Sequence, residues 1–421
     1  MRLKALRKLP ALANKILDLS KICLKSVESA PKRAYMKKLK DPMSYLAHQE
    51  QINSDVMDKI LHERQNADFS AINEAMVKSA INKANRREAL NLGDFKALLS
   101  PAAAGFLEQM AQASKAAKER YFGKNIYLFT PLYIANHCDN LCVYCGFNSK
   151  NKIRRSHLSD EGLKSELENI AKSGLCELLV LTGESESKSP LDYIAPACKK
   201  ASEYFATLGV EIYPLNTDGY ERLHNSGVDF VTVFQETYST QKYAKIHLEG
   251  NKRIFPYRIN AQERALRGAM RGVAFGVLLG IDDWRADALS VGFHAHLLQA
   301  KYPHAQISLS VPRLRPFIHN ARQSSGVNER ELAQIICAYR LFLPYAGITL
   351  STRESAAFRD GAMHLGISKL SAGVSVGIGS HSGAQSGDEQ FEINDNRDVE
   401  AMRAAILKAG LTPVFNEHIC L

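Results

Sequence analysis

The chain has 421 residues, 45% of them hydrophobic, and a formal net charge of +10. This composition is sufficient for a large buried core and excludes a fibrous or intrinsically disordered protein. The charge does not indicate nucleic-acid binding, because residues 1–40 hold twelve Lys or Arg and two Asp or Glu, whereas the remainder of the chain holds 42 of each sign.

The basic segment at the N-terminus begins Met1–Lys8 and is interrupted by Pro10. It lacks the continuous apolar stretch of a secretory signal. One interpretation is a basic amphipathic helix on a membrane or an acidic partner. We favour the other, a solvated extension or an upstream start codon with initiation at Met36 or Met43. The sequence contains no run of 18 or more apolar residues, so we do not expect a transmembrane helix.

Residues 44–125 have a helical pattern, with Asn53–Asp55 and Ser100–Pro101 as candidate helix starts. From residue 126, short apolar runs alternate with helical stretches. The predicted strands are 126–135, 176–183, 210–216, 230–237, 273–280, 305–312, 347–353 and 369–377. The predicted helices lie near 159–173, 191–208, 218–225, 260–271, 284–301, 328–342, 354–365 and 398–409.

Continuous apolar strands separated by helices predict a parallel sheet that helices cover. Eight such units in ~250 residues fit an α/β fold of the (βα)8 type, a TIM-like barrel. A doubly wound open sheet is the alternative, but the first strand–helix turn lacks a glycine-rich phosphate motif. We expect four regions: a basic N-terminal extension (1–43), a helical N-terminal region (44–125), the barrel (126–380) and a C-terminal tail (381–421).

Three of the eight cysteines, Cys138, Cys142 and Cys145, follow the first predicted strand with the spacing C-x3-C-x2-C. The other five are scattered, which does not fit a disulfide scaffold and predicts a reducing cytoplasm. Thiolates suit zinc or iron–sulfur centres. Structural zinc needs a fourth ligand, and His137 is awkwardly adjacent to Cys138. The triad therefore favours a cubane cluster that leaves one iron open to a small molecule, with a zinc loop as the alternative.

The C-terminal ends of barrel strands carry active sites, and polar residues end several predicted strands here. They are Thr182–Glu184, Asn216, Gln235–Tyr238, Ser308 with Ser310 and Arg313, and Ser351–Glu354. A barrel without a site at this end would have little reason to end so many strands in this way.

The cysteine spacing, with Tyr144 before the last cysteine, resembles the radical S-adenosylmethionine (SAM) superfamily. Segments across residues 98–415 resemble the 2-iminoacetate synthase family, the tyrosine lyases of thiamine biosynthesis. These segments are Leu98–Ala103, Pro131–Tyr133, Tyr144–Phe147, Leu181–Glu184, Phe234–Tyr238, Pro312–Pro316, Ser351–Glu354, Gln390–Ile393 and Thr412–Phe415. The related tyrosine lyase of hydrogenase-cofactor assembly adds C-terminal cysteines for a second cluster, whereas only Cys420 lies near this C-terminus, so we favour the thiamine enzyme.

This resemblance implies a barrel of the radical SAM type with an N-terminal helical extension and a C-terminal helical tail. It implies a 4Fe–4S cluster on Cys138, Cys142 and Cys145, with SAM as the second cofactor. The implied reaction cleaves L-tyrosine to 2-iminoacetate (dehydroglycine) and p-cresol. The implied partners are a thiazole synthase and an electron donor such as flavodoxin. The alternatives are another lyase for tyrosine or tryptophan, and a non-catalytic iron–sulfur or zinc scaffold.

The resemblance and the strand ends together give a set of candidate site residues. We expect Glu184 to accept hydrogen bonds from the SAM ammonium, Arg313 to bind the substrate carboxylate as a fork, and Glu236 to transfer protons. Arg315 is an alternative to Arg313, which otherwise forms an ion pair with Glu354. The expected catalytic residues are Glu236, Ser308 and Arg313, and the expected cofactor-binding residues are Tyr144, Gly183, Glu184, Gln235, Arg258 and Arg353.

Overall fold

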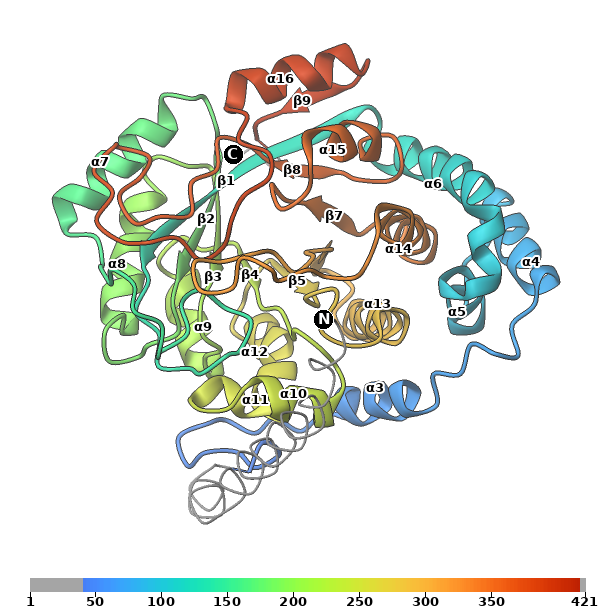
Figure 1. Cartoon of the computed structure of the whole chain (residues 1–421), viewed down its shortest axis with the longest axis horizontal. Coiled ribbons are helices and arrows are strands. Elements are labelled where there is room, and N and C mark those ends of the chain that lie inside the picture. The colour runs from blue at the N-terminus through green and yellow to red at the C-terminus, as the bar shows by residue number, and fades with distance from the viewer. Residues whose placement is uncertain (1–40, 417–421) are drawn as a thin grey trace, which may run out of the picture. The chain divides into compact units, whose positions relative to one another are not determined.

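Eight parallel strands close into a barrel in the computed structural model of the chain, which describes residues 41–416 (Figure 1). Their order is β2-β3-β4-β5-β6-β7-β8-β1, and pairing of β1 with β2 closes the ring. The strands are β1 (Asn125–Ala135), β2 (Glu177–Thr182), β3 (Thr207–Glu211), β4 (Phe230–Thr232), β5 (Gly272–Gly276), β6 (Gln306–Ser310), β7 (Gly347–Leu350) and β8 (Lys369–Ser371). The predicted (βα)8 fold is confirmed.

Most strands end earlier in the structure than the sequence predicts, and the third and fourth strands differ most clearly. The third strand begins at Thr207 rather than Val210, because Thr207 pairs with Glu177 at the start of β2 and fixes the register from there. The fourth strand ends at Thr232 rather than Thr237. The polar residues that follow Thr232 leave the ladder and form the rim of the barrel.

Helices surround the strands. They are α7 (Asp160–Ala171), α8 (Leu191–Ala201), α9 (Thr217–His224), α10 (Thr240–Ile246), α11 (Phe255–Ile259), α12 (Ala261–Arg267), α13 (Trp284–Lys301), α14 (Glu329–Phe342) and α15 (Ala356–Ala362). A capping box between Asn328 and Glu331 begins α14. The sequence analysis did not predict α10, the 3-10 turn η2 (Asn251–Arg253) or α11, which occupy the long connection after β4.

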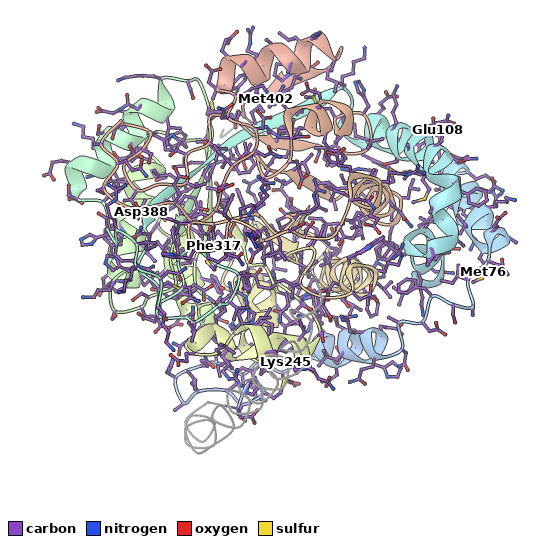
Figure 2. The ribbon with its side chains drawn as sticks, in the orientation of Figure 1. Met76, Glu108, Lys245, Phe317, Asp388 and Met402 are labelled. Atoms are coloured by element: carbon purple, nitrogen blue, oxygen red, sulfur yellow. The ribbon has the colours of Figure 1, made fainter. Side chains whose placement is uncertain are left out.

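Helices α4, α5 and α6 lie outside α13 and α14 (Figure 1). The N-terminal helical elements are α3 (Val56–Gln65), α4 (Glu74–Asn85), α5 (Leu92–Leu99), η1 (Pro101–Phe106) and α6 (Leu107–Phe122). Phe95 of α5 stacks on Phe342 of α14 with ring centroids 4.2 Å apart. This second layer buries α13 on most of its sides, whereas Met76 of α4 and Glu108 of α6 point away from the barrel (Figure 2).

The C-terminal region adds α16 (Val399–Lys408) and a ninth strand, β9 (Thr412–Val414), which the sequence analysis did not predict. Strand β1 is long enough for three partners, because it pairs with β2 through its second half and with β8 and β9 through its first half. Pairing with β9 satisfies backbone groups at the start of β1 that would otherwise form an open edge.

Residues from Pro42 onward form one compact unit. The predicted division of the chain at residues 43, 125 and 380 stays a proposal, and the basic extension lies outside the described residues except for its last three positions. Among the described helices, none combines the length and apolar character that a membrane span requires.

Candidate active site

A cavity of about 700 Å³ runs through the barrel, and the three motif cysteines line it at the C-terminal ends of the strands. Side chains from every strand of the barrel contribute to its wall. Phe129, Leu179 and Val273 make part of the wall apolar, whereas Glu211, Glu236 and Arg353 place charge near the strand ends. This distribution fits an amphipathic ligand held at the end of the barrel where active sites of this fold lie.

The loop after β1 carries the cysteines and is held by hydrogen bonds to Arg155 and to the backbone of Ile246. Arg155 donates hydrogen bonds to the carbonyls of Asn136, Phe147 and Asn148. The backbone N–H of Val143 donates to the carbonyl of Ile246 at 3.1 Å. These contacts hold the loop in place and fix the three thiols at the cavity.

The donor set fits an iron–sulfur cluster. Burial raises the pKa of the Cys138 thiol to about 12, although the backbone N–H groups of Asn140 and Glu184 oppose this shift. Burial likewise raises the pKa of Cys142 well above its ordinary value. A raised pKa favours the protonated thiol, and a metal that binds the sulfur replaces this proton because the thiolate is the form that ligates metals. Three thiols on one loop suit a cubane, because a cubane is held through separate irons, one thiolate to each.

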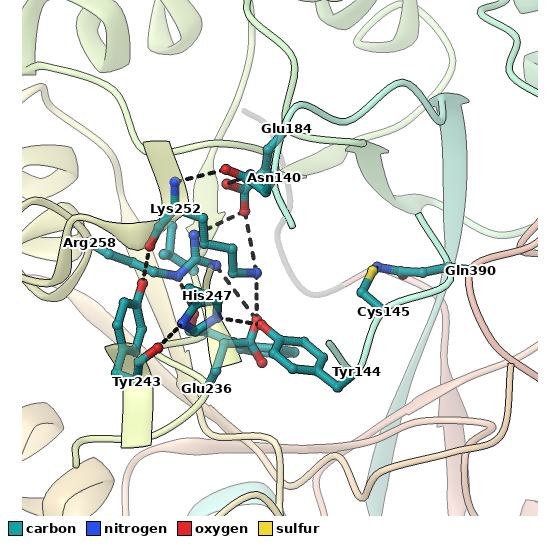
Figure 3. A network of polar contacts seen from close by, with 12 residues as sticks. Asn140, Tyr144, Cys145, Glu184, Glu236, Tyr243, His247, Lys252, Arg258 and Gln390 are labelled. Atoms are coloured by element: carbon teal, nitrogen blue, oxygen red, sulfur yellow. Dashed lines mark hydrogen bonds and ion pairs between the residues drawn. The ribbon is translucent and has the colours of Figure 1, made fainter. Parts of the chain in front are cut away.

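A network of buried charges lies beside the cysteines (Figure 3). Arg258 of α11 lies 3.0 Å from Glu184, and Lys252 of η2 lies 2.7 Å from Glu236 and 3.4 Å from Glu184. Burial opposes ionisation of Glu184, but Lys252 and Arg258 hold its pKa below the ordinary value. Asn140 of the cysteine loop donates to Glu184 at 3.0 Å, so the network and the loop form one unit.

Tyr144 is fixed by His247, which follows α10. The Tyr144 hydroxyl and His247 Nε2 are 2.7 Å apart, and His247 Nδ1 lies 3.0 Å from the carbonyl of Tyr243. Burial and the nearby Lys252 lower the pKa of His247 well below its ordinary value, so the imidazole is neutral. Because Nδ1 donates to a carbonyl, Nε2 accepts from Tyr144.

Glu236 adopts a left-handed backbone conformation with φ of 70°, which is uncommon for a residue with a side chain. Asp287 of α13 holds the following turn by accepting from the Thr237 hydroxyl at 3.1 Å and the Tyr238 N–H at 3.0 Å. The strained conformation turns the Glu236 carboxylate into the cavity, and strain of this kind clusters at functional sites.

The structure brings most of the predicted site residues together at the cavity. Those that line it are Cys138, Cys142, Cys145, Tyr144, Gly183, Glu184, Glu236, Arg258, Ser308 and Arg353. Gly183 is required where it stands, because a Cβ there would lie 2.2 Å from the carbonyl oxygen of His137. Their assignment to individual roles stays a prediction.

Two predicted residues lie elsewhere. Arg313 does not line the cavity and instead pairs with Glu354, with Nε 3.0 Å from a carboxylate oxygen, whereas Arg315 does line it. Gln235 is buried and does not line the cavity, whereas its neighbours Phe234 and Glu236 do.

Lys252, Gln390 and Glu211 also line the cavity, and the sequence analysis gave none of the three a role in the site, although Gln390 lies in a segment that resembles the family. Gln390 accepts from the Tyr133 hydroxyl at 2.8 Å and donates to Cys145 Sγ at 3.5 Å. Gly146 allows this approach, because a Cβ there would lie 2.2 Å from the Gln390 carbonyl oxygen. The glutamate of Val210-Glu211-Ile212 was a detectable signal, since a charged residue inside an apolar strand is rarely buried without a role.

Known proteins are similar to this chain in sequence and in fold. The 2-iminoacetate synthase of Escherichia coli (strain K12) is 38% identical over 80% of this chain and 90% of its own length. The enzyme of that name from Salmonella typhimurium is 37% identical over 82% of this chain and 90% of its own length. This chain belongs to the 2-iminoacetate synthase family. The predicted resemblance is confirmed.

Further matches agree with this family. Residues 310–412 match the model of the Biotin and Thiamin Synthesis associated domain. The FeFe-hydrogenase maturase HydG from Carboxydothermus hydrogenoformans has a similar structure, with a TM-score of 0.79 and 28% identity over 87% of this chain and 86% of its own. Methylornithine synthase shares the fold with a TM-score of 0.65 and 20% identity, over 80% of this chain and 97% of its own. The matched domain includes Arg315, Arg353 and Gln390, which lie at the cavity of this member of the 2-iminoacetate synthase family.

Proposed function

We propose that this chain is a radical SAM lyase that cleaves the Cα–Cβ bond of L-tyrosine to 2-iminoacetate (dehydroglycine) and p-cresol. SAM is consumed to 5′-deoxyadenosine and methionine, and 2-iminoacetate supplies the thiazole moiety of thiamine. The observation that carries this proposal is the convergence of three anchored thiols and a paired-charge network on one cavity in a barrel of the 2-iminoacetate synthase family.

The cofactors in this proposal are a 4Fe–4S cluster held by Cys138, Cys142 and Cys145, and SAM. When bound, they supply a 5′-deoxyadenosyl radical that abstracts a hydrogen atom from the substrate. The protein orients these groups. Glu184 and Arg258 line the cavity as an ion pair and so present both signs of charge to the ammonium and carboxylate groups of an amino-acid headgroup.

The apolar and the charged parts of the cavity wall have different roles in the proposed binding of the substrate. The apolar residues deeper in the barrel provide a surface for an aromatic ring and exclude water. Arg315 and Arg353 are the cavity-lining arginines available for the substrate carboxylate, and Arg353 stacks on Phe391 with its guanidinium carbon 3.5 Å from the ring centroid. Because Arg313 is paired with Glu354, we assign the carboxylate contact to these two arginines in preference to Arg313.

We further propose a thiazole synthase as the acceptor of 2-iminoacetate, which hydrolyses readily in water. A flavodoxin-like protein is the proposed electron donor, and a reducing cytoplasm is the proposed location. The second candidate function is that of the hydrogenase-cofactor tyrosine lyase, which the structural similarity to HydG favours.

The deciding experiment is anaerobic reconstitution with iron and sulfide, followed by reductant, SAM and one amino acid at a time. We expect p-cresol and 5′-deoxyadenosine only with tyrosine. Indole products from tryptophan would favour a tryptophan lyase, whereas release of CO and cyanide from tyrosine would favour the hydrogenase-cofactor lyase. Iron binding without SAM cleavage for any amino acid would indicate a scaffold.

The variant Cys142→Ala tests the cluster site. We expect it to lose iron and SAM cleavage, because one thiolate in three is removed from the loop. The matched control is Cys198→Ala, which removes a buried cysteine of α8 that does not line the cavity and is expected to retain its iron. Equal iron content in the two variants would refute the assignment.

A further inference from the structure

Glu211 is exceptional among the carboxylates of the cavity. Four acidic side chains line it in the described part of the chain: Glu177, Glu184, Glu211 and Glu236. Glu177 pairs with Lys369 at 2.8 Å, and the charge network of Lys252 and Arg258 neutralises Glu184 and Glu236. Glu211 makes no hydrogen bond and no ion pair among the described residues, so its carboxylate remains available for a ligand.

The position of Glu211 places it at the reactive end of the barrel. It is the last residue of β3 and lies in register with Leu181 of β2, which lies in register with Tyr133 of β1. All three side chains line the cavity. Tyr133 connects through Gln390 to Cys145, so this layer of residues adjoins the cysteine loop. A ligand group that contacts Glu211 therefore lies in the part of the cavity next to the proposed cofactors.

The charges that face Glu211 come from several elements. Burial, followed by the negative charge of Glu236, raises the pKa of Glu211 to about 7, against the opposing effect of Arg353, Lys252 and Arg258. The Tyr133 hydroxyl also faces it. Glu211 is partly buried inside the barrel and has no polar partner among the described residues, so a structural role does not explain its position. Such a group in a cavity is a candidate for proton transfer.

We propose that Glu211 is a catalytic residue that accepts the proton lost by the α-ammonium group of the substrate. This inference rests on the proposed function, in which the radical abstracts a hydrogen atom from the substrate, and it adds that this atom comes from the amino group, which must then be in its neutral amine form. In the step, an N–H bond of the ammonium breaks and its proton bonds to a Glu211 carboxylate oxygen. The products are a neutral amine and a neutral carboxylic acid, and no electron is transferred.

The variant Glu211→Gln separates proton transfer from binding. The amide oxygen still accepts a hydrogen bond from the ammonium, but the side chain does not take up a proton. We expect kcat for p-cresol formation to fall by about 100-fold or more, with KM for tyrosine changed by about threefold or less. Iron content and SAM affinity are expected to stay at the wild-type level.

The pH profile gives a signature that a structural role would not produce. In the wild type, kcat/KM is expected to rise with pH through about 7, because the base must be ionised before it takes up a proton. This limb should be absent in Glu211→Gln and present in Glu211→Asp. The matched control Glu177→Gln removes a cavity carboxylate at the other end of the barrel, where β2 begins, and should keep the limb.

Retention of half the wild-type kcat and of the acid limb by Glu211→Gln would overturn the inference while leaving the proposed function intact. Absence of p-cresol in the wild type would instead refute the proposed function. The same comparison is then made with whichever amino acid supports 5′-deoxyadenosine formation, because every amino acid carries the ammonium group.

Infrared spectroscopy tests the inference without catalytic turnover, and it remains informative if the Glu211→Gln variant does not fold. Infrared difference spectra of the reconstituted wild type and of Glu211→Asp should show a carboxylic acid band when tyrosine binds. A band in the wild type that is shifted in Glu211→Asp supports the inference. Its absence from the wild type overturns it.

Discussion

Lys252 shows how one residue organises the charges of the site. Its ammonium group lies between Glu236 and Glu184, and its backbone N–H donates to Asn140 of the cysteine loop at 2.9 Å. Burial alone would lower the pKa of Lys252, but the two carboxylates raise it above the ordinary value. The lysine therefore stays charged and, together with Arg258, holds the pKa of Glu184 below its ordinary value.

We predict that Lys252→Met destabilises the protein by about 3 kcal/mol, because removing one partner leaves buried charge without compensation. The matched control is Lys150→Met, whose ion pair with Glu249 is exposed and is expected to contribute less than about 1 kcal/mol. Chemical unfolding followed by circular dichroism measures both. Equal effects of the two substitutions would show that Lys252 is not part of a buried network.

At the scale of elements, the cysteine loop depends on contact with a segment far away in sequence. The C-terminal segment at Gln390 passes over Gly146, and the segment that carries Phe317 crosses near the barrel centre in the view of Figure 2. Gln323 donates to the carbonyls of Tyr144 and Arg315 at 3.1 and 3.0 Å, so this second segment also packs on the loop. The site is thus completed by residues on the C-terminal side of β6.

We predict that Gly146→Ala displaces the Gln390 segment, because its Cβ would lie 2.2 Å from a backbone oxygen. Overpacking of this kind costs about 1–3 kcal/mol, and iron retention after desalting is expected to fall with it. Gly105→Ala is the control, since no atom lies within 4 Å of the added Cβ. Thermal unfolding and iron analysis test both variants, and an unchanged Gly146→Ala protein would contradict the proposed packing.

At the scale of the whole molecule, buried carboxyl groups make stability depend on pH. Burial raises the pKa of Asp287 to about 7, although Arg64 of α3 opposes the shift. Between about pH 4 and 7 the folded protein holds a proton that the unfolded chain has lost. The free energy of unfolding therefore falls as pH rises across this window, by up to about 1.4 kcal/mol per pH unit for this group.

We predict that Asp287→Asn removes this dependence. The stability of the variant relative to the wild type should rise by about 3 kcal/mol between pH 4 and pH 7. The single tryptophan, Trp284, is buried, lies three residues before Asp287 in the sequence and reports unfolding by fluorescence. A constant difference between the two proteins across this range would show that Asp287 is ionised in the folded state.

The sequence alone determined the local chemistry and the class of fold. The spacing of Cys138, Cys142 and Cys145 and the alternation of apolar strands with helices are contiguous patterns, so they predicted the cysteine loop and the barrel directly. The start of β3 and the presence of β9 were not predicted from the sequence. Thr207 is placed by pairing with Glu177 of β2, and β9 is placed by pairing with the start of β1.

Only the tertiary structure decided which side chains meet. Arg313 and Arg315 are equivalent as sequence, but Glu354 pairs with the first and leaves the second to the cavity. Neither Lys252 nor Glu211 lies in a recognisable motif. Lys252 pairs with two carboxylates, whereas Glu211 has no ion-pair partner among the described residues. The reason is physical: pairing and desolvation depend on the distances between elements that the closed barrel brings together, and spacing along the chain does not encode those distances.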